Sequence, residues 1–229
     1  RMKLTQTRKI YGGYRRTNGF LRSNAVLVSG MALPFVVVPT ITLKAGVAIS
    51  AAVLCSLEAA MIVAALIGER LPQWARIAVS VNAAMAAIFL IYPLAGLLSP
   101  QLYDAMGIYF CLAALNTMVL VRTESYAVHH TWYHSALDGL RYGGGFALVA
   151  LVLSAVRELL GQGTLWGTQL LPFRLPAVQM VFFGFIAVGM MAAAANGIRR
   201  LLGRLLWSVD NPKPPKGKEN SLEEVTQDA

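Results

Sequence analysis

The chain has 229 residues, of which 56% are hydrophobic and only 14% are charged. A soluble domain carries roughly 25% charged residues, so this composition excludes a soluble enzyme, a disordered protein and a disulfide scaffold. The net charge of +9 comes from 20 basic and 11 acidic residues. It indicates either nucleic-acid binding or cytoplasmic membrane loops, and the positions of the charges decide between the two.

Long runs without charge predict membrane-spanning helices, because about 20 apolar residues in a helix cross the hydrocarbon core. In chain order, the predicted spans are Ser23–Leu43, Ala45–Gly68, Ile77–Tyr103, Ala105–Val121, Tyr142–Val156 and Leu175–Ile198. The runs are too long for strands and do not alternate. We therefore predict an all-α integral membrane domain over residues 23–200, preceded by a basic segment, 1–22, and followed by a disordered tail, 201–229.

The basic residues are divided unequally between the two sides of this predicted domain. If the six spans alternate in direction, 17 Lys and Arg lie on the side of the two termini. The other side has 3, namely Lys44, Arg157 and Arg174. The positive-inside rule then places both termini in the cytoplasm. Topology accounts for the basic excess, and no nucleic-acid partner is expected.

Spans one and four carry helix-breaking residues and open the two three-helix halves, residues 23–98 and 99–200. Span one contains Gly30, Pro34 and Pro39, and span four is short and begins next to Gly107. Three crossings reverse direction, so the halves would be antiparallel. Interrupted segments at matching positions indicate an inverted repeat with a functional site at the midplane. The alternative is that each proline only kinks its helix.

Two motifs in the second half carry a family resemblance. The first runs Ser135-Ala-Leu-Asp-Gly-Leu-Arg-Tyr-Gly-Gly-Gly-Phe146, and the second begins Arg157-Glu-Leu-Leu-Gly-Gln-Gly-Thr164. They resemble S-x-x-D-G, G-x-G-F and R-E-x-x-G-x-G-T in the E-type membrane component of the Rnf electron-transport complex. They are similar also to the D-type component of the sodium-pumping NADH:quinone reductase. Upstream, Arg122-Thr-Glu124 resembles the family's G-R-A-E.

The resemblance implies six helices, an inverted repeat and a cytoplasmic N-terminus in a bacterial plasma membrane. It implies a non-catalytic subunit of a complex that couples electron flow between ferredoxin and NAD to Na⁺ or H⁺ movement. The implied partners are a homologous A-type membrane subunit and flavin-binding and ferredoxin-like subunits. In the family, half-helix cysteines of the A-type and E-type components hold an iron–sulfur centre between them.

The sequence departs from the family at those cysteines. Leu33 (or Ala32, depending on the gap) replaces the first, and Thr117 replaces the second. Iron–sulfur clusters need thiolate ligands, so we expect no cofactor on this chain. Cys55 lies elsewhere, and Cys111 precedes Thr117 by six residues, about 9 Å along a helix. Either Cys111 is a displaced ligand, or the chain is a divergent paralogue that kept the fold and lost the cluster.

Glu58 is the main ion-coupling candidate. It lies near the middle of span two, where an acid is costly unless it is paired or hydrated. We expect cation coordination or proton relay there; the alternative is a protonated side chain with a packing role. Asn82 and Asn116 are weaker candidates that interhelical hydrogen bonding would also explain.

The remaining polar residues are assigned structural roles. Arg122, Glu124, Asp138, Arg157 and Glu158 are expected to cap helices and tie them together. The string His129, His130 and His134 allows a zinc site, with His130 and His134 at i, i+4 spacing, but we favour surface histidines because no cysteine or acid completes a ligand set. For the whole chain, the alternatives to a redox-complex subunit are a small-molecule or ion transporter on the same repeat, or a scaffold without a cofactor.

Overall fold

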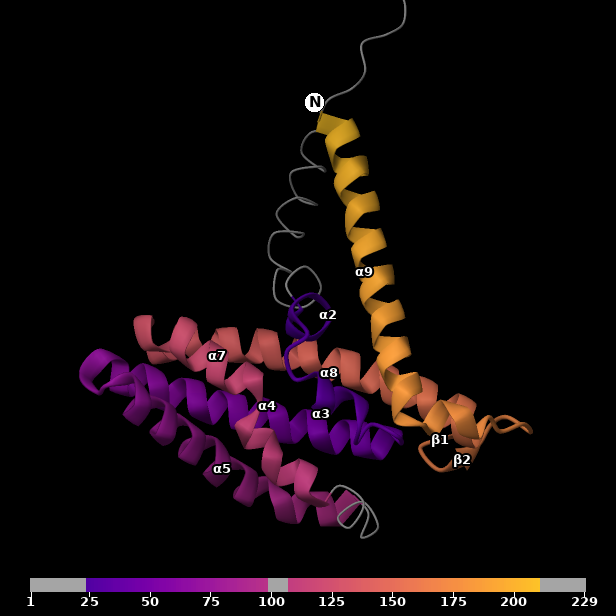
Figure 1. Cartoon of the computed structure of the whole chain (residues 1–229), viewed down its shortest axis with the longest axis horizontal. Helices are drawn as coiled ribbons and strands as arrows, with labels where there is room; N and C mark the ends of the chain where they lie inside the picture. Colours follow the sequence, from indigo (N-terminus) through magenta and orange to yellow (C-terminus); the bar gives the residue numbers. More distant parts are fainter. Residues whose placement is uncertain (1–23, 99–106, 211–229) are drawn as a thin grey trace, which may run out of the picture. The chain divides into compact units, whose positions relative to one another are not determined.

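The structure is a computed structural model that describes residues 24–98 and 107–210. The predicted basic segment 1–22, the connection 99–106 and the end of the predicted tail lie outside the described residues. The described chain is mainly helical (Figure 1). Its α-helices are α2 (Ala25–Ser29), α3 (Leu33–Val37), α4 (Leu43–Ile67), α5 (Gln73–Leu98), a helix over 107–112, α7 (Thr117–Ser125), α8 (Trp132–Gln162) and α9 (Val181–Asp210).

Four of the described helices are long and apolar enough to cross a membrane: Leu43–Arg70, Gln73–Pro93, Trp132–Gln162 and Val181–Leu201. They correspond to predicted spans two, three, five and six, so an all-α, multi-pass membrane architecture is supported. The residues of predicted spans one and four instead form pairs of short helices. The six-span inverted repeat is therefore not established by these helices alone.

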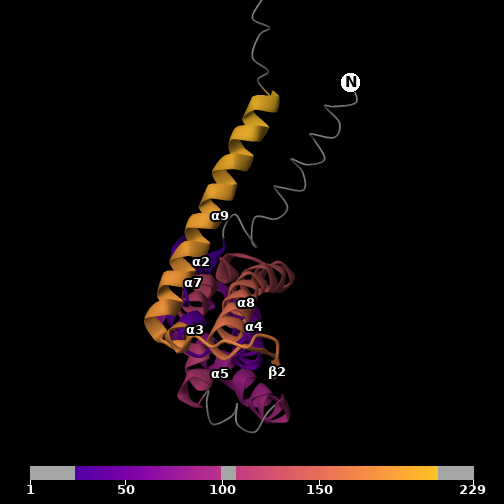
Figure 2. The same cartoon turned by 90° about the vertical axis from the view of Figure 1, so that its right-hand side faces the viewer.

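The core is centred on α4, which packs against both α8 and α5 (Figure 1). The turned view shows these three helices nearly end-on (Figure 2). Small residues allow α4 and α8 to approach closely. A Cβ added at Gly143 would lie 2.5 Å from Leu54 Cδ1, and one added at Gly46 would collide with the Ser154 side chain. Glycine at these positions is thus a packing requirement.

Two helix boundaries differ from the predicted spans. α8 begins at Trp132, ten residues before predicted span five, and its 31 residues extend for about 46 Å. That length exceeds the membrane core of about 30 Å. α9 begins at Val181, because Pro176–Gln179 forms a 3₁₀ turn first. It runs to Asp210, into the range assigned to the tail.

A short hairpin follows α8, in a chain whose sequence predicts no strand. Thr164–Leu165 pairs antiparallel with Thr168–Gln169 across a turn in which Trp166 and Gly167 have positive φ angles. Two-residue strands are too short to show an alternating pattern, which is why the sequence does not reveal them.

The chain forms two compact units that divide between Ala192 and Ala193, and the sites described below lie in the first.

Candidate functional site

The first broken helix is capped at its start and interrupted at its middle. Asn24 caps α2, since its side-chain oxygen accepts hydrogen bonds from the amides of Val26 and Leu27 at 2.9 and 3.1 Å. Its amide nitrogen also donates to the Gly145 carbonyl of α8 at 2.8 Å. α2 ends at Gly30, with φ +64°, and α3 begins after Ala32, with φ +61°. The helix is therefore interrupted between two residues in the left-handed conformation.

The second break lies between the helix over 107–112 and α7. A 3₁₀ turn, Ala113–Leu115, leads to Asn116, whose backbone is extended. The Asn116 side-chain oxygen accepts a hydrogen bond from the Met118 amide at 3.0 Å and so caps α7. Asn116 is fully buried, and its Nδ2 has no hydrogen-bond partner within the described residues. An asparagine at each broken helix thus supplies a helix cap.

The two breaks meet. The backbone amide of Ala32 donates a hydrogen bond to Thr117 Oγ1 at 3.0 Å. The two positions at which the sequence lacks the cysteines of the family that it resembles therefore come together in space. The first is Leu33 or Ala32, and the second is Thr117. Thr117 and its neighbour Leu115 are exposed on the surface of this chain. The meeting point is accordingly built by both broken helices and is open on one side.

A buried arginine fixes the far end of the first broken helix. Arg157 is fully buried in α8, and its guanidinium donates to the Val37 carbonyl at the end of α3 at 2.5 Å. The same group donates to the Thr40 carbonyl at 3.3 Å. It also donates to three carbonyls just before α9, those of Val178, Gln179 and Met180. Those carbonyls bind Arg157 instead of continuing a helix, which explains the late start of α9.

Glu158, the next residue, accepts hydrogen bonds from backbone amides in other parts of the chain. Its Oε2 accepts from the Leu43 amide at the start of α4 at 2.5 Å, and its Oε1 accepts from the Gly167 amide at 3.1 Å. Thr164 Oγ1 donates to the same Oε1 at 3.3 Å. A carboxylate at a helix N-terminus is favourable because the first-turn amides are unpaired and the dipole is positive there.

A second polar cluster lies toward the other end of α4. Arg122 of α7 donates to Asp138 of α8, with Nε at 3.1 Å and Nη2 in a closer ion pair. The Arg122 guanidinium carbon lies 3.9 Å from the centre of the Tyr142 ring, a cation–π contact. Nearby, Arg76 of α5 pairs with Glu124 of α7 at 2.8 Å. These four charged residues form two ion pairs.

Glu58 faces this cluster from α4. A Cβ added at Gly139 would lie 2.7 Å from Glu58 Oε1, so the carboxylate occupies the space beside that glycine. Gly139 directly follows Asp138 in α8, so the Glu58 carboxylate lies near the Arg122–Asp138 ion pair. Its Oε1 is buried and has no hydrogen-bond partner in the part of the chain that the structure describes.

The other candidates are more scattered. Asn82 is exposed on α5 and donates to the Ala78 carbonyl of its own helix at 2.8 Å. Cys55 and Cys111 are free thiols, each partly buried. His129 lies 3.1 Å from Glu69, and His130 stacks on Tyr126. Within the described ranges, no three His, Cys, Asp or Glu side chains form a group that could hold a metal ion.

Comparison with known proteins agrees with this architecture. Residues 15–201 match the family described as Rnf-Nqr subunit, membrane protein. The chain belongs to the Rnf-Nqr membrane-subunit family. The resemblance predicted from the two motifs is thereby confirmed, and the chain is a multi-pass membrane protein.

Individual Rnf-Nqr relatives are named as the E-type component of an ion-translocating oxidoreductase complex. The relative from Shewanella frigidimarina is 34% identical over 149 residues, which is 65% of this chain and 64% of the relative. The one from Shewanella oneidensis is 29% identical over 200 residues, 80% of this chain and 86% of the relative. The one from Shewanella loihica is 33% identical over 148 residues, 65% and 64%. The match thus spans just under two thirds of the first relative.

The residues at the meeting point do not fit the iron–sulfur centre that the Rnf-Nqr resemblance implies. Such clusters are held by thiolates, whereas Ala32, Leu33 and Thr117 offer two apolar side chains and a hydroxyl. Thr117 Oγ1 already accepts the Ala32 amide. Cys111 lies six residues before Thr117, beyond the 3₁₀ turn.

Glu58 forms a cluster with Arg122, Asp138, Gly139 and Tyr142, which we call the Glu58 cluster. Sequence reasoning missed two of its members. Gly139 makes room for the carboxylate, and Tyr142 covers the Arg122–Asp138 pair. Both follow Asp138 within about one helical turn and belong to the motif that runs from Ser135 to Phe146, so that motif could have indicated them. Ser135, the first residue of that motif, is also fully buried, and its Oγ has no hydrogen-bond partner within the described residues.

Proposed function

We propose that this Rnf-Nqr chain is a membrane core subunit of an Rnf-like, ion-translocating electron-transport complex of a bacterial plasma membrane. Its contribution is part of the cation path, with Glu58 as the coupling group, and it holds no electron carrier of its own. The names of the three relatives, which describe ion translocation by an oxidoreductase complex, support the class. The Glu58 cluster supports the assignment of a cation path, rather than an electron carrier, to this chain.

Charge balance in the cluster carries the proposal. Asp138 is neutralised by Arg122, with which it forms an ion pair. Glu58 is left as the unmatched charge, with Oε1 buried and without a donor in the described chain. A lone carboxylate within the membrane is costly unless it takes up a proton or another cation. One net negative charge suits H⁺ or a monovalent ion such as Na⁺.

The exposed meeting point supports a partner subunit. Thr117 and Leu115 face outward where the two broken helices join. A homologous A-type membrane subunit would cover this surface, and flavin-binding and ferredoxin-like subunits would complete the complex. In this arrangement the broken helices are spans one and four of an inverted six-span repeat. Both termini are cytoplasmic.

The polar contacts support this topology, because each of them joins groups that the topology places on one side of the membrane. Arg76 pairs with Glu124, and His129 contacts Glu69, all on the predicted cytoplasmic side. Arg157 contacts Thr40, close to Lys44, on the opposite side. Reporter fusions or thiol labelling at the two termini and at residue 44 test the orientation, and labelling of all three from the same side would refute it.

The test is Glu58→Gln in the intact complex, assayed in membrane vesicles. Gln keeps the shape of the side chain but cannot release a proton or neutralise a cation. We expect Na⁺ or H⁺ uptake per electron transferred to fall by at least about tenfold, while the complex still assembles. The matched control is Glu69→Gln, an exposed acid at the end of the same helix. An unchanged ratio of ions to electrons for Glu58→Gln would refute the coupling role.

A scaffold role is the second candidate, favoured by the absence of thiols at Leu33 and Thr117. A scaffold and a cation path give different results in the same assay, because only the cation path makes ion uptake depend on Glu58. Iron analysis and EPR spectroscopy of the complex show whether a cluster is bound at Cys111. A stand-alone transporter would move ions when the chain alone is reconstituted in liposomes.

A further inference from the structure

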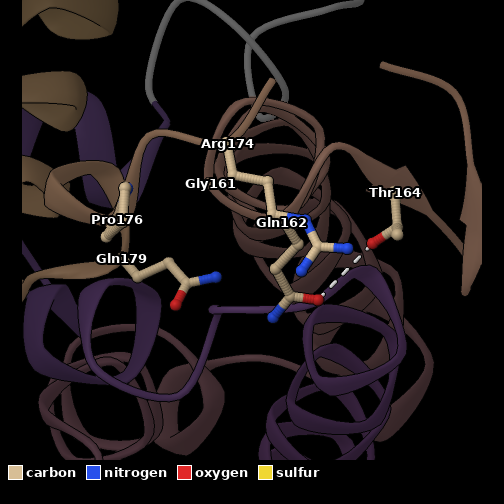
Figure 3. Close-up of a pocket in the computed structure, with 6 residues that line it drawn as sticks. All are labelled: Gly161, Gln162, Thr164, Arg174, Pro176 and Gln179. Atoms are coloured by element: carbon tan, nitrogen blue, oxygen red, sulfur yellow. Dashed lines mark hydrogen bonds between the residues drawn. The ribbon is translucent and has the colours of Figure 1, made fainter. Parts of the chain in front are cut away.

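A pocket of about 390 Å³ opens at the end of α8, away from the Glu58 cluster (Figure 3). It lies between the last turn of α8 and the connection to α9. The residues that line it are Gly161, Gln162, Thr164, Arg174, Pro176 and Gln179. None of them is acidic, and one is a permanent cation. The proposed function uses none of them.

Hydrogen-bond donors dominate the polar lining. The Arg174 guanidinium lies next to the Gln162 side chain, and the Gln179 amide reaches toward them from the opposite wall (Figure 3). Within the described residues, Arg174 makes no ion pair. Gln162 Oε1 lies 3.4 Å from the Thr164 hydroxyl, so the NH₂ group on the other side of the Gln162 amide is the part that a ligand would contact. Guanidinium and amide donors around one cavity suit an oxyanion, in particular a phosphate.

The nearest acid does not compete for this charge. Glu158 is buried, and its two oxygens accept hydrogen bonds from the amides of Leu43 and Gly167 and from the Thr164 hydroxyl. Its neighbour Arg157 supplies a compensating charge at the same end of α8. Arg174 therefore adds an unbalanced positive charge to the pocket.

The surroundings indicate a lipid rather than a soluble anion. The charge-free part of α8 ends at Val156, six residues before Gln162, which favours a place for the pocket beyond the hydrocarbon core, at the level of the headgroups. The residues on either side of Arg174, Phe173 and Leu175, are 50% and 48% exposed. Trp166 and Leu170 of the hairpin region are exposed as well. A basic pocket with apolar and aromatic neighbours at this depth matches the interfacial zone of a bilayer.

We propose that this pocket binds the phosphate of an anionic phospholipid, with Arg174 as the charge and the amides of Gln162 and Gln179 as additional donors. The acyl chains pass over the exposed apolar side chains of Phe173 and Leu175. The site is independent of Glu58 and of the electron-transfer partners.

The experiment uses the full chain, purified and stripped of native lipid, in native mass spectrometry. Dioleoylphosphatidylglycerol is compared with dioleoylphosphatidylcholine, and inorganic phosphate is tested as a competitor. We expect phosphatidylglycerol to be retained preferentially, and Arg174→Gln to weaken its binding roughly fivefold, the effect of one basic residue near anionic lipid. Arg174→Lys should retain part of the affinity. Arg141→Gln, an exposed cation near the other end of α8, is the matched control and should change nothing.

Three outcomes would overturn the proposal. The first is equal retention of the two lipids by the unaltered chain. The second is equal loss of binding in Arg174→Gln and Arg141→Gln, which would indicate general surface charge. The third is full displacement by millimolar inorganic phosphate, which would indicate a soluble anion as the ligand. If Arg174→Gln fails to fold, Gln162→Ala provides the same comparison without removing a charge, and undiminished binding in it would count against the site.

Discussion

The backbone amide of Ala32 donates to Thr117 Oγ1 at 3.0 Å and so joins two broken helices that lie 85 residues apart in the sequence. Ala32 has φ +61°, a left-handed conformation that is uncommon for residues other than glycine. The end of α3 is held separately, by the hydrogen bond from Arg157 to Val37. One contact therefore holds Ala32, with its unfavourable backbone conformation, at the start of α3, and the other holds the end of that helix.

This juxtaposition predicts a specific cross-link. In a background without Cys55 and Cys111, Ala32→Cys combined with Thr117→Cys should form a disulfide on mild oxidation, because the 3.0 Å contact from the Ala32 amide to Thr117 Oγ1 makes the two residues direct neighbours. Mass spectrometry of the digested protein detects the linked peptides. The control pairs Ala32→Cys with Asn82→Cys, which lies on the exposed side of α5. Equal cross-linking of both pairs would mean that the breaks do not meet.

Arg157 predicts a large effect on stability. The side chain is fully buried and donates to five backbone carbonyls. Arg157→Met should lower the free energy of unfolding in detergent by about 3–5 kcal/mol, because it leaves several buried carbonyls without a donor. Arg157→Lys should recover little, since an ammonium cannot replace the planar fork of donors. Arg141→Met, at an exposed position, should change stability by about 0.5 kcal/mol or less.

The Arg157 contacts also show what the sequence could and could not predict. The first break was predictable because Gly30 and Pro34 act on their own backbone. Span four was predicted to be irregular from its shortness and from Gly107, whereas its break lies nine residues later, at Asn116. The partners of Arg157 were not predictable, because carbonyl groups are present at every residue and carry no sequence signal. The same contacts displace the start of α9 to Val181, six residues past the predicted start.

The candidate site was predictable to a similar extent. Glu58 stood out because an acid in an apolar run is rare. Its placement beside Gly139 depends on the register between α4 and α8, which no local pattern fixes. Asn82 satisfied the same polarity criterion, yet it lies on the exposed side of α5 and bonds within its own helix. A polar residue in an apolar run can thus be picked out from the sequence as a site candidate. Whether it faces another helix or the outside depends on how the helices pack.

Two glycines in the hairpin region allow backbone strain and steric collision to be separated. Both Gly163 and Gly167 have positive φ, +71° and +87°. A Cβ at Gly163 would lie 2.7 Å from the Leu171 carbonyl oxygen, whereas a Cβ at Gly167 would have no neighbour within 4 Å among the described residues. Gly167→Ala should therefore cost only the left-handed strain, about 1–2 kcal/mol. Gly163→Ala should cost clearly more, and equal unfolding midpoints would contradict the close approach of that carbonyl.

Gly139→Ala tests the position of Glu58 without altering any charge. The new methyl group would lie 2.7 Å from Glu58 Oε1 and would displace the end of a flexible side chain, so the cost in stability should stay below about 1 kcal/mol. Ion uptake per electron should nevertheless fall, because the carboxylate no longer occupies the space beside Asp138. Gly189→Ala is the control and should leave uptake unchanged, because no atom of the described residues lies within 4 Å of the added methyl group. In the Glu58→Gln background, Gly139→Ala should cause no further loss of uptake, because the coupling carboxylate is already gone. A further loss there, or normal uptake in the single Gly139→Ala variant, would place the coupling group elsewhere.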